Sequence, residues 1–466
     1  MTLIKSISGI RGTIGGKAGE NLTPVDVARF ASAFGMWIKK NSSAAMPHVV
    51  IGRDARPSGK MVRSIVASSL NALGIDVTDL GLSTTPTVEM AVTNFNADGG
   101  IIITASHNPK NWNALKLLNS KGEFISAEDG ATILEIAEHE SFQFAEVDSL
   151  GRYCRNDSQI QKHIEQIISL PLVDADAIRR KKLKVVIDCV NSTGGIALPL
   201  LLKSLGVKEI IELYCLSDGN FPHNPEPLPE NLTALSAEVK KQNAHLGFAV
   251  DPDVDRLAIV CEDGEMFGEE YTLVAVADYV LQNEKGTTVS NLSSTRALRD
   301  VTETHGQKYF ASAVGEVNVV QLMKEKNAVI GGEGNGGIIY PKLHYGRDAL
   351  VGIALFLSHL ARSEKSCSQL RKTYPDYFMA KKKIELSPEI NVDEILEAMK
   401  SKYSQHEINT TDGVKIDFSN SQFSGWVHLR KSNTEPIIRI YTENTSQSNA
   451  DSLAEKIIGE IREISC

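Results

Sequence analysis

A serine that could carry a transferred group follows an apolar stretch of the chain. The segment reads IIITASHNP, and Ser106 stands two residues after an expected strand at 101–104. Ligands of open α/β sheets bind beyond the carboxyl ends of the strands, so chemistry is expected here. A plain polar turn through His107 and Asn108 is the alternative. An acyl-transfer serine is disfavoured, because the chain contains no G-x-S-x-G motif.

Three aspartates crowd into one turn between two apolar stretches. In the segment GFAVDPDVDRLAIV they are Asp251, Asp253 and Asp255. Carboxylates this close repel one another unless a cation neutralises them, and an oxygen-only ligand set suits Mg²⁺. An EF-hand calcium loop is disfavoured, because Arg256 replaces its invariant glycine even though Glu262 has the spacing of its last ligand. The other alternative is an acidic turn exposed to solvent, but the apolar stretches on both sides of the turn argue against it.

A glycine-rich loop later in the chain has the residue pattern of a dinucleotide-binding motif but not the helix that must follow it. The stretch AVIGGEGNGGIIYP contains G-x-G-x-x-G from Gly332 to Gly337. A dinucleotide site needs a helix after this motif, and Pro341 stops any helix here. The loop instead displays Glu333 and Asn335, which can bond sugar hydroxyls, with a flexible turn as the alternative.

Basic and short polar side chains gather in a fourth segment, HLRKSNTEPIIRIY. Two guanidiniums, three polar side chains and the amides of a turn form a suitable nest for a phosphate dianion. These residues are Arg430, Ser432, Asn433, Thr434 and Arg439. The alternative is a helix capping box from Ser432 to Glu435, but PIIRIYTE alternates like a strand and leaves such a cap without a helix.

The elements that must position these loops repeat along the chain. A β-branched strand, a polar turn, a helical stretch and a second strand occur in this order three times. The copies begin with HVVIGRDARPSG, KLKVVIDCVNSTGG and, more weakly, TTVSNLSSTRALRD. This βαβ pattern predicts three related α/β domains. A cap at Thr23, Pro24 in the first turn and Asp26 three residues after the cap predict a helix up to Lys39.

The last part of the chain has a different order of expected strands and helices. After the polar run SEKSCSQLRK, strand-like stretches alternate with two helix-like ones, which indicates a smaller α+β domain. We expect four domains that each carry one of the loops above, in the order of the chain. Their ranges are 1–150 with the serine loop, 151–256 with the acidic turn, 257–370 with the glycine-rich loop and 371–466 with the basic loop.

Composition narrows the class of protein. The chain has 466 residues, a net charge of -9 and 42% hydrophobic residues, as in soluble globular domains. Its negative charge argues against general binding to nucleic acid or to anionic membranes. The scattered cysteines form no C-x-x-C pair, and no apolar run approaches the ~20 residues of a membrane span. We expect a cytoplasmic protein with reduced thiols, and the lack of a P-loop argues against a nucleotide-driven kinase.

Taken in order, the motifs TASHNP, DPDVDR, GEGNGG and RKSNTEP resemble those of the α-D-phosphohexomutase family. The opening SGIRG, the segment GRDAR and the segment FPHNPEPLPENL at 221–232 are also similar to family segments, so the resemblance covers nearly the whole chain. The family comprises phosphoglucomutases, phosphomannomutases and phosphoglucosamine mutases. The resemblance implies three related α/β domains with mixed sheets around a central cleft, plus a smaller C-terminal α+β domain.

The resemblance also implies catalytic and metal-binding roles. Ser106 would be the phosphoserine. One Mg²⁺ would be bound by Ser106, Asp251, Asp253 and Asp255. Lys116 matches a general acid/base, and His107 belongs to the same catalytic group. Arg11 and Arg256 would support the phosphoserine region.

Substrate-binding roles follow in the same way. The sugar hydroxyls would be held by Glu333, Gly334 and Asn335. The phosphate that is not transferred would be held by Arg430, Ser432, Asn433, Thr434 and Arg439.

Two loops depart from the family pattern. Many bacterial members carry serine where Asn335 stands and histidine where Gly337 stands, so any role of that histidine is lost or moved. Pro252 and Val254 replace frequent glycines, which stiffens the acidic turn and removes no ligand.

These features predict an Mg²⁺-dependent phosphohexomutase that interconverts hexose 6-phosphate and hexose 1-phosphate. Phosphoryl transfer needs in-line positioning and charge neutralisation, which the metal, the cationic side chains and the phosphate nest would supply. Phospho-Ser106 would give its group to O1 or O6 of the sugar. The resulting hexose 1,6-bisphosphate, which also serves as activator, would turn over and return a phosphate to the serine.

The resemblance favours glucosamine phosphate as the substrate, because the third loop and the opening look like that branch of the family. A dual phosphomannomutase/phosphoglucomutase is the alternative. A non-catalytic phosphosugar-binding protein and a simple phosphatase are more distant alternatives. We expect a small-molecule sugar phosphate as the partner, neither nucleic acid nor membrane, and a monomer or a homodimer.

Overall fold

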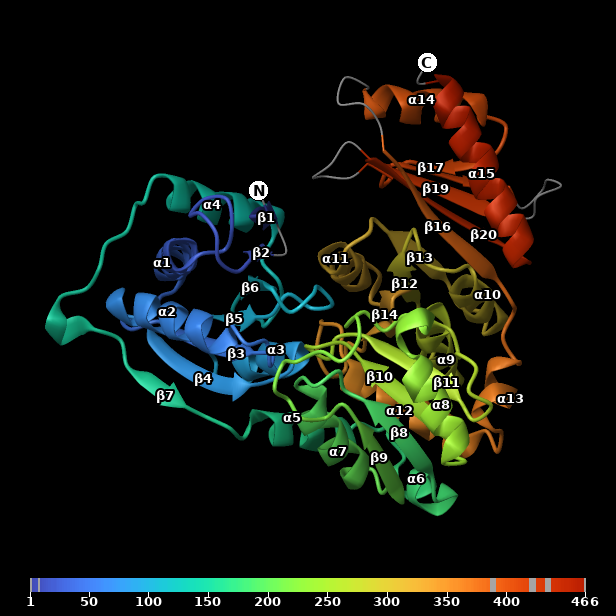
Figure 1. The fold of residues 1–466 in the computed structure, drawn as a ribbon, viewed down its shortest axis with the longest axis horizontal. Coiled ribbons are helices and arrows are strands. Elements are labelled where there is room, and N and C mark those ends of the chain that lie inside the picture. The colour runs from blue at the N-terminus through green and yellow to red at the C-terminus, as the bar shows by residue number, and fades with distance from the viewer. Residues whose placement is uncertain (1, 7–8, 386–390, 419–424, 432–436, 465–466) are drawn as a thin grey trace. The chain divides into compact units, whose positions relative to one another are not determined.

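The computed structural model describes residues 2–6, 9–385, 391–418, 425–431 and 437–464 (Figure 1). They fall into two compact units. The first unit contains residues 1–272 and 335–370, and the second contains residues 273–334 and 371–466.

A seven-stranded mixed sheet forms the N-terminal part of the first unit. Its strand order is β1-β2-β6-β5-β3-β4-β7. The strands are β1 (Ile4–Ser6), β2 (Gly9–Thr13), β3 (His48–Arg53), β4 (Asp76–Leu82), β5 (Gly99–Ile103), β6 (Trp112–Leu118) and β7 (Tyr153–Arg155). Strand β3 runs parallel to β4 and β5, so the loops that begin with Asp54, Ser83 and Thr104 leave the sheet at one edge.

Helices cover both faces of this sheet, and alternate strand residues face two separate cores. Ile51 and Ile101 belong to the core shared with α1 (Pro24–Asn41), α2 (Gly59–Ala72) and α4 (Ala127–Glu138). Val50 and Ile102 belong to the core on the side of α3 (Thr85–Asn94).

The first helix was predicted from its capping signals, and that prediction is confirmed. Helix α1 begins at Pro24, and the Thr23 side chain accepts a hydrogen bond from the Asp26 amide, while the Asp26 side chain bonds the Thr23 amide. This reciprocal capping box satisfies backbone donors that the first turn leaves unpaired. The helix extends two residues past Lys39, to Asn41.

A four-stranded sheet with the order β11-β10-β8-β9 forms the second part of the first unit. Its strands are β8 (Lys184–Asp188), β9 (Glu209–Leu213), β10 (Leu246–Val250) and β11 (Leu257–Cys261). Its helices are α5 (Gln159–Ile168), α6 (Ala175–Lys181), α7 (Gly194–Ser204) and α8 (Thr233–Lys241). Strands β10 and β11 form an antiparallel hairpin, and the acidic turn at 251–256 connects them. Strand β15 (Gly337–Ile339) and helix α12 (Ala349–Arg362) complete this unit, and Phe356 of α12 packs edge-on against Phe248 of β10.

The second unit contains a parallel and an antiparallel sheet. Parallel strands β13 (Tyr309–Ser312), β12 (Thr288–Asn291) and β14 (Ile330–Glu333) lie in this spatial order, accompanied by α10 (Ala297–Thr304) and α11 (Glu316–Lys326). The antiparallel sheet has the order β16-β20-β19-β18-β17. Its elements are β16 (Phe378–Glu385), α14 (Val392–Lys402), β17 (Glu407–Asn409), β18 (Val414–Asp417), β19 (Trp426–Lys431), β20 (Ile437–Asn444) and α15 (Gln447–Ile464). Helices α9 (Glu269–Asn283) and α13 (Cys367–Arg371) span the unit boundaries in the sequence.

The predicted fold class is confirmed. Mixed α/β sheets precede an antiparallel sheet that two helices accompany in the C-terminal part. Among the described helices, none combines the length and the apolar character that a bilayer span requires.

A buried cluster of two histidines and two carboxylates, which we call the His344 cluster, ties three helices of the first unit together. His163 of α5 bonds Thr87 of α3 at 2.9 Å and Asp348, which caps α12, at 3.0 Å. His344 lies 3.3 Å from Glu89 of α3 and 3.5 Å from Asp348. Burial alone would lower the pKa of His344, but its contacts with Asp348 and Glu89 raise that pKa to about 10.

We expect the His344 cluster to stabilise the first unit in a pH-dependent manner. Because the folded pKa of His344 lies above its ordinary value, its contribution is full below pH 6.5 and is lost as pH rises through about 10. The substitution His344→Gln leaves two buried carboxylates without their cation and should cost roughly 3 kcal/mol at pH 6.5. The thermal midpoints of the two proteins, measured from pH 6 to pH 11, should converge at the alkaline end.

The exposed His139 provides the control, because His139→Gln makes the same chemical change outside any buried cluster. An equal difference in midpoint between wild type and His344→Gln at all pH values would contradict this account.

Candidate active site

Ser106 lies in a constrained turn beside the acidic turn, although 145 residues separate it from Asp251 in the sequence. Its Oγ donates a hydrogen bond to Asp251 Oδ2 at 2.7 Å. Its φ is 49°, a left-handed conformation that is uncommon outside glycine and costs about 1–3 kcal/mol. The Ser106 amide donates to Thr104 Oγ1 at 3.0 Å, which helps to hold this conformation.

A buried arginine that the sequence analysis did not single out holds the serine turn. Arg56 is 1% exposed and pairs through Nε with Asp54 at 2.9 Å. Its terminal nitrogens donate to the carbonyl oxygens of Ser106, Asn108 and Pro109. The segment GRDAR contains both Asp54 and Arg56, but a single sequence does not indicate which loop the guanidinium would reach.

The three aspartates of the acidic turn are fully buried, and one carboxylate oxygen of each lies within 4.8 Å of the others. Asp251 Oδ1 accepts hydrogen bonds from the amides of Asp255 and Arg256 at 3.1 and 3.2 Å. No described residue donates a hydrogen bond to Asp253 Oδ1 or Asp255 Oδ1. Buried carboxylate oxygens normally have partners, so this oxygen-only set fits a hard divalent cation such as Mg²⁺.

Electrostatics inside the turn agree with a site for a cation. Burial raises the pKa of Asp251 well above its ordinary value, and the charges of Asp255 and Asp253 raise it further. Burial also acts to raise the pKa of Asp253, but Lys116 outweighs it and holds that pKa below its ordinary value. A divalent cation would relieve the repulsion that makes ionisation of Asp251 unfavourable.

Two cationic side chains from other parts of the first unit contact the acidic turn. Lys116 Nζ of β6 lies 2.8 Å from Asp253 Oδ2 and 3.6 Å from Asp255 Oδ2. Burial alone would lower the pKa of Lys116, but these two carboxylates hold it above its ordinary value, so the side chain is an ammonium. Arg347, which the sequence analysis missed, donates to Asp255 Oδ2 at 2.7 Å.

Arg347 also accounts for the glycine at position 337. A Cβ added to Gly337 would lie 2.3 Å from Arg347 Cδ, so a histidine there would collide with the arginine. The space next to the glycine-rich loop is thus filled by Arg347, whose guanidinium reaches the acidic turn.

The remaining catalytic candidates of the first unit surround the same turn. Arg256 lies 3.2 Å from Glu226, and Glu226 lies 3.9 Å from His107 Nε2. His107 Nδ1 lies 3.4 Å from Ser106 Oγ. Burial and the nearby Arg256 charge lower the pKa of His107 to about 3, so its imidazole is neutral. Glu226 was not predicted, although the segment FPHNPEPLPENL that contains it was noted.

Arg11 lies on β2 opposite Ala114 of β6. Lys116 is two residues further along β6, so Arg11 is on the same face of the sheet as Lys116. The structure thus gathers Ser106, His107, Lys116, Arg256 and the three aspartates, with Arg11 on the adjoining sheet face.

The predicted sugar-binding residues stand around the end of β14. Glu333 is 5% exposed and accepts hydrogen bonds from the Asn291 side chain at 2.9 Å and the Gly315 amide at 3.2 Å. The Gly334 amide donates a hydrogen bond to the Ser294 hydroxyl at 3.1 Å. Asn335, in the first unit, accepts from the amide of Gly337 through Oδ1 and so closes its own turn.

Two residues of the predicted phosphate nest lie on the antiparallel sheet of the second unit. Arg430 of β19 is directly opposite Arg439 of β20. Like charges in this arrangement repel, and a bound dianion would relieve the repulsion. Arg430 is oriented by Asp412, whose Oδ2 it contacts at 2.7 Å. The other three members, Ser432, Asn433 and Thr434, lie outside the described residues.

Comparison with protein families finds four consecutive matches. They carry the descriptions phosphoglucomutase/phosphomannomutase alpha/beta/alpha domain I at 3–144, domain II at 161–264, domain III at 268–377 and C-terminal domain at 380–460. Together they span most of the chain.

Individual proteins are similar over nearly the same span. A phosphoglucomutase/phosphomannomutase of Thermococcus kodakarensis is 38% identical over 445 residues, which cover 94% of this chain and 95% of that protein. A probable phosphoglucosamine mutase of Methanopyrus kandleri is 32% identical over 459 residues, which cover 98% and 97%. A crystal structure of a phosphoglucomutase/phosphomannomutase family protein from Burkholderia thailandensis has a TM-score of 0.83 at 28% identity and covers 99% of this chain and 97% of that one.

We expect Mg²⁺ binding to depend on the acidic turn. Asp255→Asn removes one of the three charges and should weaken Mg²⁺ binding by at least about 10-fold, since even indirect damage to metal sites has effects of 10- to 100-fold. Isothermal titration calorimetry on protein freed of metal by a chelator measures the affinity. The control is Asp148→Asn, which removes a charge from the exposed 3-10 helix Val147–Ser149. Equal affinities for Asp255→Asn and wild type would exclude this turn as the metal site.

Proposed function

The chain belongs to the phosphoglucomutase/phosphomannomutase family, and on that premise we propose that it interconverts glucosamine 6-phosphate and glucosamine 1-phosphate through a phosphorylated Ser106. It is a phosphohexomutase, an isomerase that moves a phosphoryl group within a sugar phosphate. The observation that carries the proposal is the 2.7 Å hydrogen bond from Ser106 Oγ to the buried acidic turn.

Charge neutralisation is the first requirement of phosphoryl transfer. Asp251, Asp253 and Asp255 would hold one Mg²⁺, which neutralises charge on the phosphoryl oxygens when it is bound. Lys116 and Arg347 bring two further positive charges to the same turn. Ser106 is only 9% exposed, so water has little access to its hydroxyl and hydrolysis of a phosphoserine is disfavoured.

Two transfers make up the proposed cycle. A sugar hydroxyl attacks the phosphorus of phospho-Ser106, the bond between phosphorus and Oγ breaks, and a hexose 1,6-bisphosphate forms. Lys116, an ammonium in this arrangement, donates a proton to the departing Oγ and recovers one from the sugar hydroxyl. The bisphosphate then turns over, and Ser106 takes the phosphoryl group from the other end of the sugar. The bisphosphate therefore also serves as activator.

The substrate would be held by residues of the second unit and of the glycine-rich loop. Glu333, Gly334 and Asn335 are the candidates for the sugar hydroxyls. The cross-strand pair Arg430 and Arg439 supports binding of the phosphate that is not transferred, because two opposed guanidiniums favour a dianion.

Glucosamine is the favoured sugar, since the Methanopyrus kandleri relative carries the name of a probable phosphoglucosamine mutase. The more similar Thermococcus kodakarensis relative is named for glucose and mannose phosphates, which supports a dual phosphomannomutase/phosphoglucomutase as the second candidate.

We expect Ser106→Ala to abolish mutase turnover, with a loss on the order of 10⁴-fold or more, because the group that carries the phosphoryl is gone. Intact mass after incubation with glucose 1,6-bisphosphate should reveal a phosphate adduct on wild type and none on the variant. The exposed Ser120 supplies the control Ser120→Ala, which should keep both adduct and activity. A Ser106→Ala enzyme with full mutase activity would refute the phosphoserine cycle, and net phosphate release by wild type would indicate a phosphatase.

Substrate preference is a separate expectation. With Mg²⁺ and a bisphosphate primer, kcat/KM should be higher for glucosamine 1-phosphate than for glucose 1-phosphate or mannose 1-phosphate. A higher value for either of the other two sugars would overturn the choice of glucosamine and leave the phosphoserine cycle untouched.

A further inference from the structure

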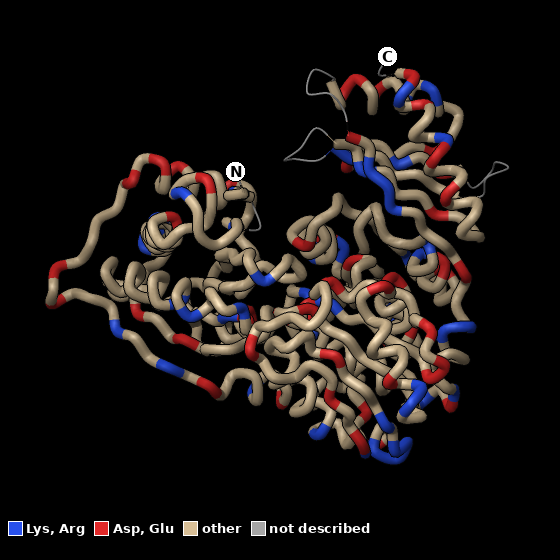
Figure 2. Tube along the Cα trace, in the orientation of Figure 1, with Lys and Arg blue, Asp and Glu red and all other residues tan. Residues whose placement is uncertain are grey.

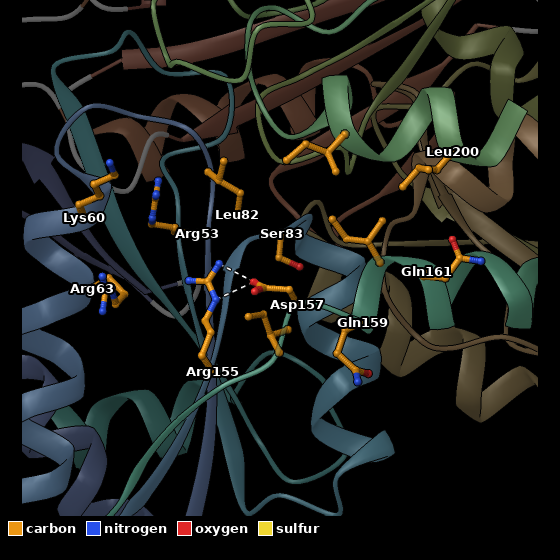
Figure 3. Close-up of a pocket in the computed structure, with 13 residues that line it drawn as sticks. Arg53, Lys60, Arg63, Leu82, Ser83, Arg155, Asp157, Gln159, Gln161 and Leu200 are labelled. Atoms are coloured by element: carbon orange, nitrogen blue, oxygen red, sulfur yellow. Dashed lines mark hydrogen bonds and ion pairs between the residues drawn. The ribbon is translucent and has the colours of Figure 1, made fainter. Parts of the chain in front are cut away.

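A cavity of about 450 Å³ lies in the first unit, and no residue of the acidic turn lines it. One wall comes from α2 and the ends of β3, β4 and β7, and the opposite wall comes from α5 and α7. Figure 3 shows Arg53, Lys60 and Arg63 on one side of this cavity and Gln161 and Leu200 on the other. The volume is within the range of small-molecule sites, roughly 300–1,000 Å³.

The cavity has an excess of positive charge. Four cations line it, Arg53, Lys60, Arg63 and Arg155, but only one carboxylate, Asp157. Arg155 pairs with Asp157 at 2.5 Å. Lysine and arginine also gather elsewhere along the trace, as in the run RRKKLK at 179–184 (Figure 2).

One more carboxylate lies behind the wall and pairs with two of the same cations. Asp79 is buried and lies 3.5 Å from Arg63 and 3.4 Å from Arg155. In the described part of the chain, no carboxylate lies within ion-pair distance of Arg53 or Lys60. Burial lowers the pKa of Arg53 from its ordinary value, and the charges of Asp54 and Asp79 oppose this shift without cancelling it.

A buried hydroxyl without a partner lies in the same wall. Ser83 is 1% exposed, and its Oγ makes no hydrogen bond with any described residue. Buried hydroxyls are normally bonded, so an isolated one in a cationic cavity indicates a place for a ligand oxygen.

The opposite wall suits the body of an organic molecule. Ile160, Ile196 and Leu200 present aliphatic side chains, and Gln159 and Gln161 present amides. Leu200 is a large apolar residue that remains 38% exposed on the surface of α7. A bare inorganic anion would leave this wall without contacts.

We propose that this cavity is a second anion-binding site, separate from the Ser106 site, that takes a small organic phosphate. The phosphate lies among Arg53, Lys60 and Arg63 with an oxygen at the Ser83 hydroxyl, and the organic body covers the aliphatic wall. This site goes beyond the mutase reaction, since none of its lining residues belongs to the acidic turn or the serine turn or makes a hydrogen bond or ion pair with them.

The site is nevertheless one residue away from groups that hold the active site. Arg53 precedes Asp54, which orients Arg56 against the serine turn. Ser83 is bonded to the Arg53 carbonyl through its amide at 2.9 Å. Two residues later, the Thr85 hydroxyl donates to Asp253 Oδ2 at 2.6 Å. The two sites thus share the ends of β3 and β4.

Uridine 5′-monophosphate is a suitable probe, because it joins a phosphate monoester to a flat organic body. Isothermal titration calorimetry should detect its binding to wild type. The double substitution Lys60→Ala/Arg63→Ala should weaken binding by about tenfold or more through the loss of charge-assisted hydrogen bonds. Leu200→Glu, which keeps all four cations and places a carboxylate at the exposed rim, should weaken it similarly.

Two controls separate this cavity from other sites. Arg180→Ala removes an exposed arginine elsewhere in the first unit, and Arg430→Ala damages the proposed substrate-phosphate nest; neither should weaken binding of the probe. Unchanged mutase activity of Lys60→Ala/Arg63→Ala without the probe would establish that this variant is folded. The proposal is overturned if the probe does not bind, if only Arg430→Ala weakens it, or if neither cavity variant does. A lack of mutase activity in the wild-type protein would instead contradict the proposed function and would leave the test of this cavity unaffected.

Discussion

Repulsion among three buried carboxylates governs the centre of the first unit. Two carboxylates about 4 Å apart repel by about 4 kcal/mol at an effective dielectric constant of 20. The protein offsets this repulsion with Lys116, Arg347, the Arg256 guanidinium and two amides of the turn itself. In the described part of the chain, Lys116, Arg347 and Arg256 lie within ion-pair distance of Asp253 or Asp255, whereas no cation pairs with Asp251. Asp253 Oδ1 and Asp255 Oδ1 accept no hydrogen bond from a described residue, so a metal cation at these oxygens would add charge compensation to the turn.

The need to neutralise this turn explains why separate parts of the fold meet there. The aspartates come from the turn of the β10–β11 hairpin, and Lys116 comes from β6. Arg347 comes directly before Asp348, the residue that caps α12. Arg347 and Asp348 are adjacent in the sequence but contact different parts of the first unit. One neutralises the acidic turn, and the other joins the His344 cluster that ties α12 to α3 and α5. Packing of the helices and electrostatics of the site therefore depend on the same short segment.

Local signals in the sequence predicted local structure well. The capping residues Thr23 and Asp26 act through contacts three residues apart, so one sequence suffices to predict the start of α1. The four loops were recognisable because each concentrates unusual residue types within a few positions. Arg56, Glu226 and Arg347 were missed because their partners are distant in the sequence. A guanidinium reaches a loop 50 or 92 residues away only after the sheets have formed, and no spacing in the sequence records that reach.

The backbone of Ser106 is fixed on both sides of its side chain. Its amide is bonded to Thr104, and its carbonyl is bonded to the buried guanidinium of Arg56. Rotation about the Cα–Cβ bond is thus the main freedom left to this residue. The peptide around the serine can keep one shape whether the oxygen is esterified or free. A carrier group that is loaded and unloaded in every cycle then needs no refolding of its loop between turnovers.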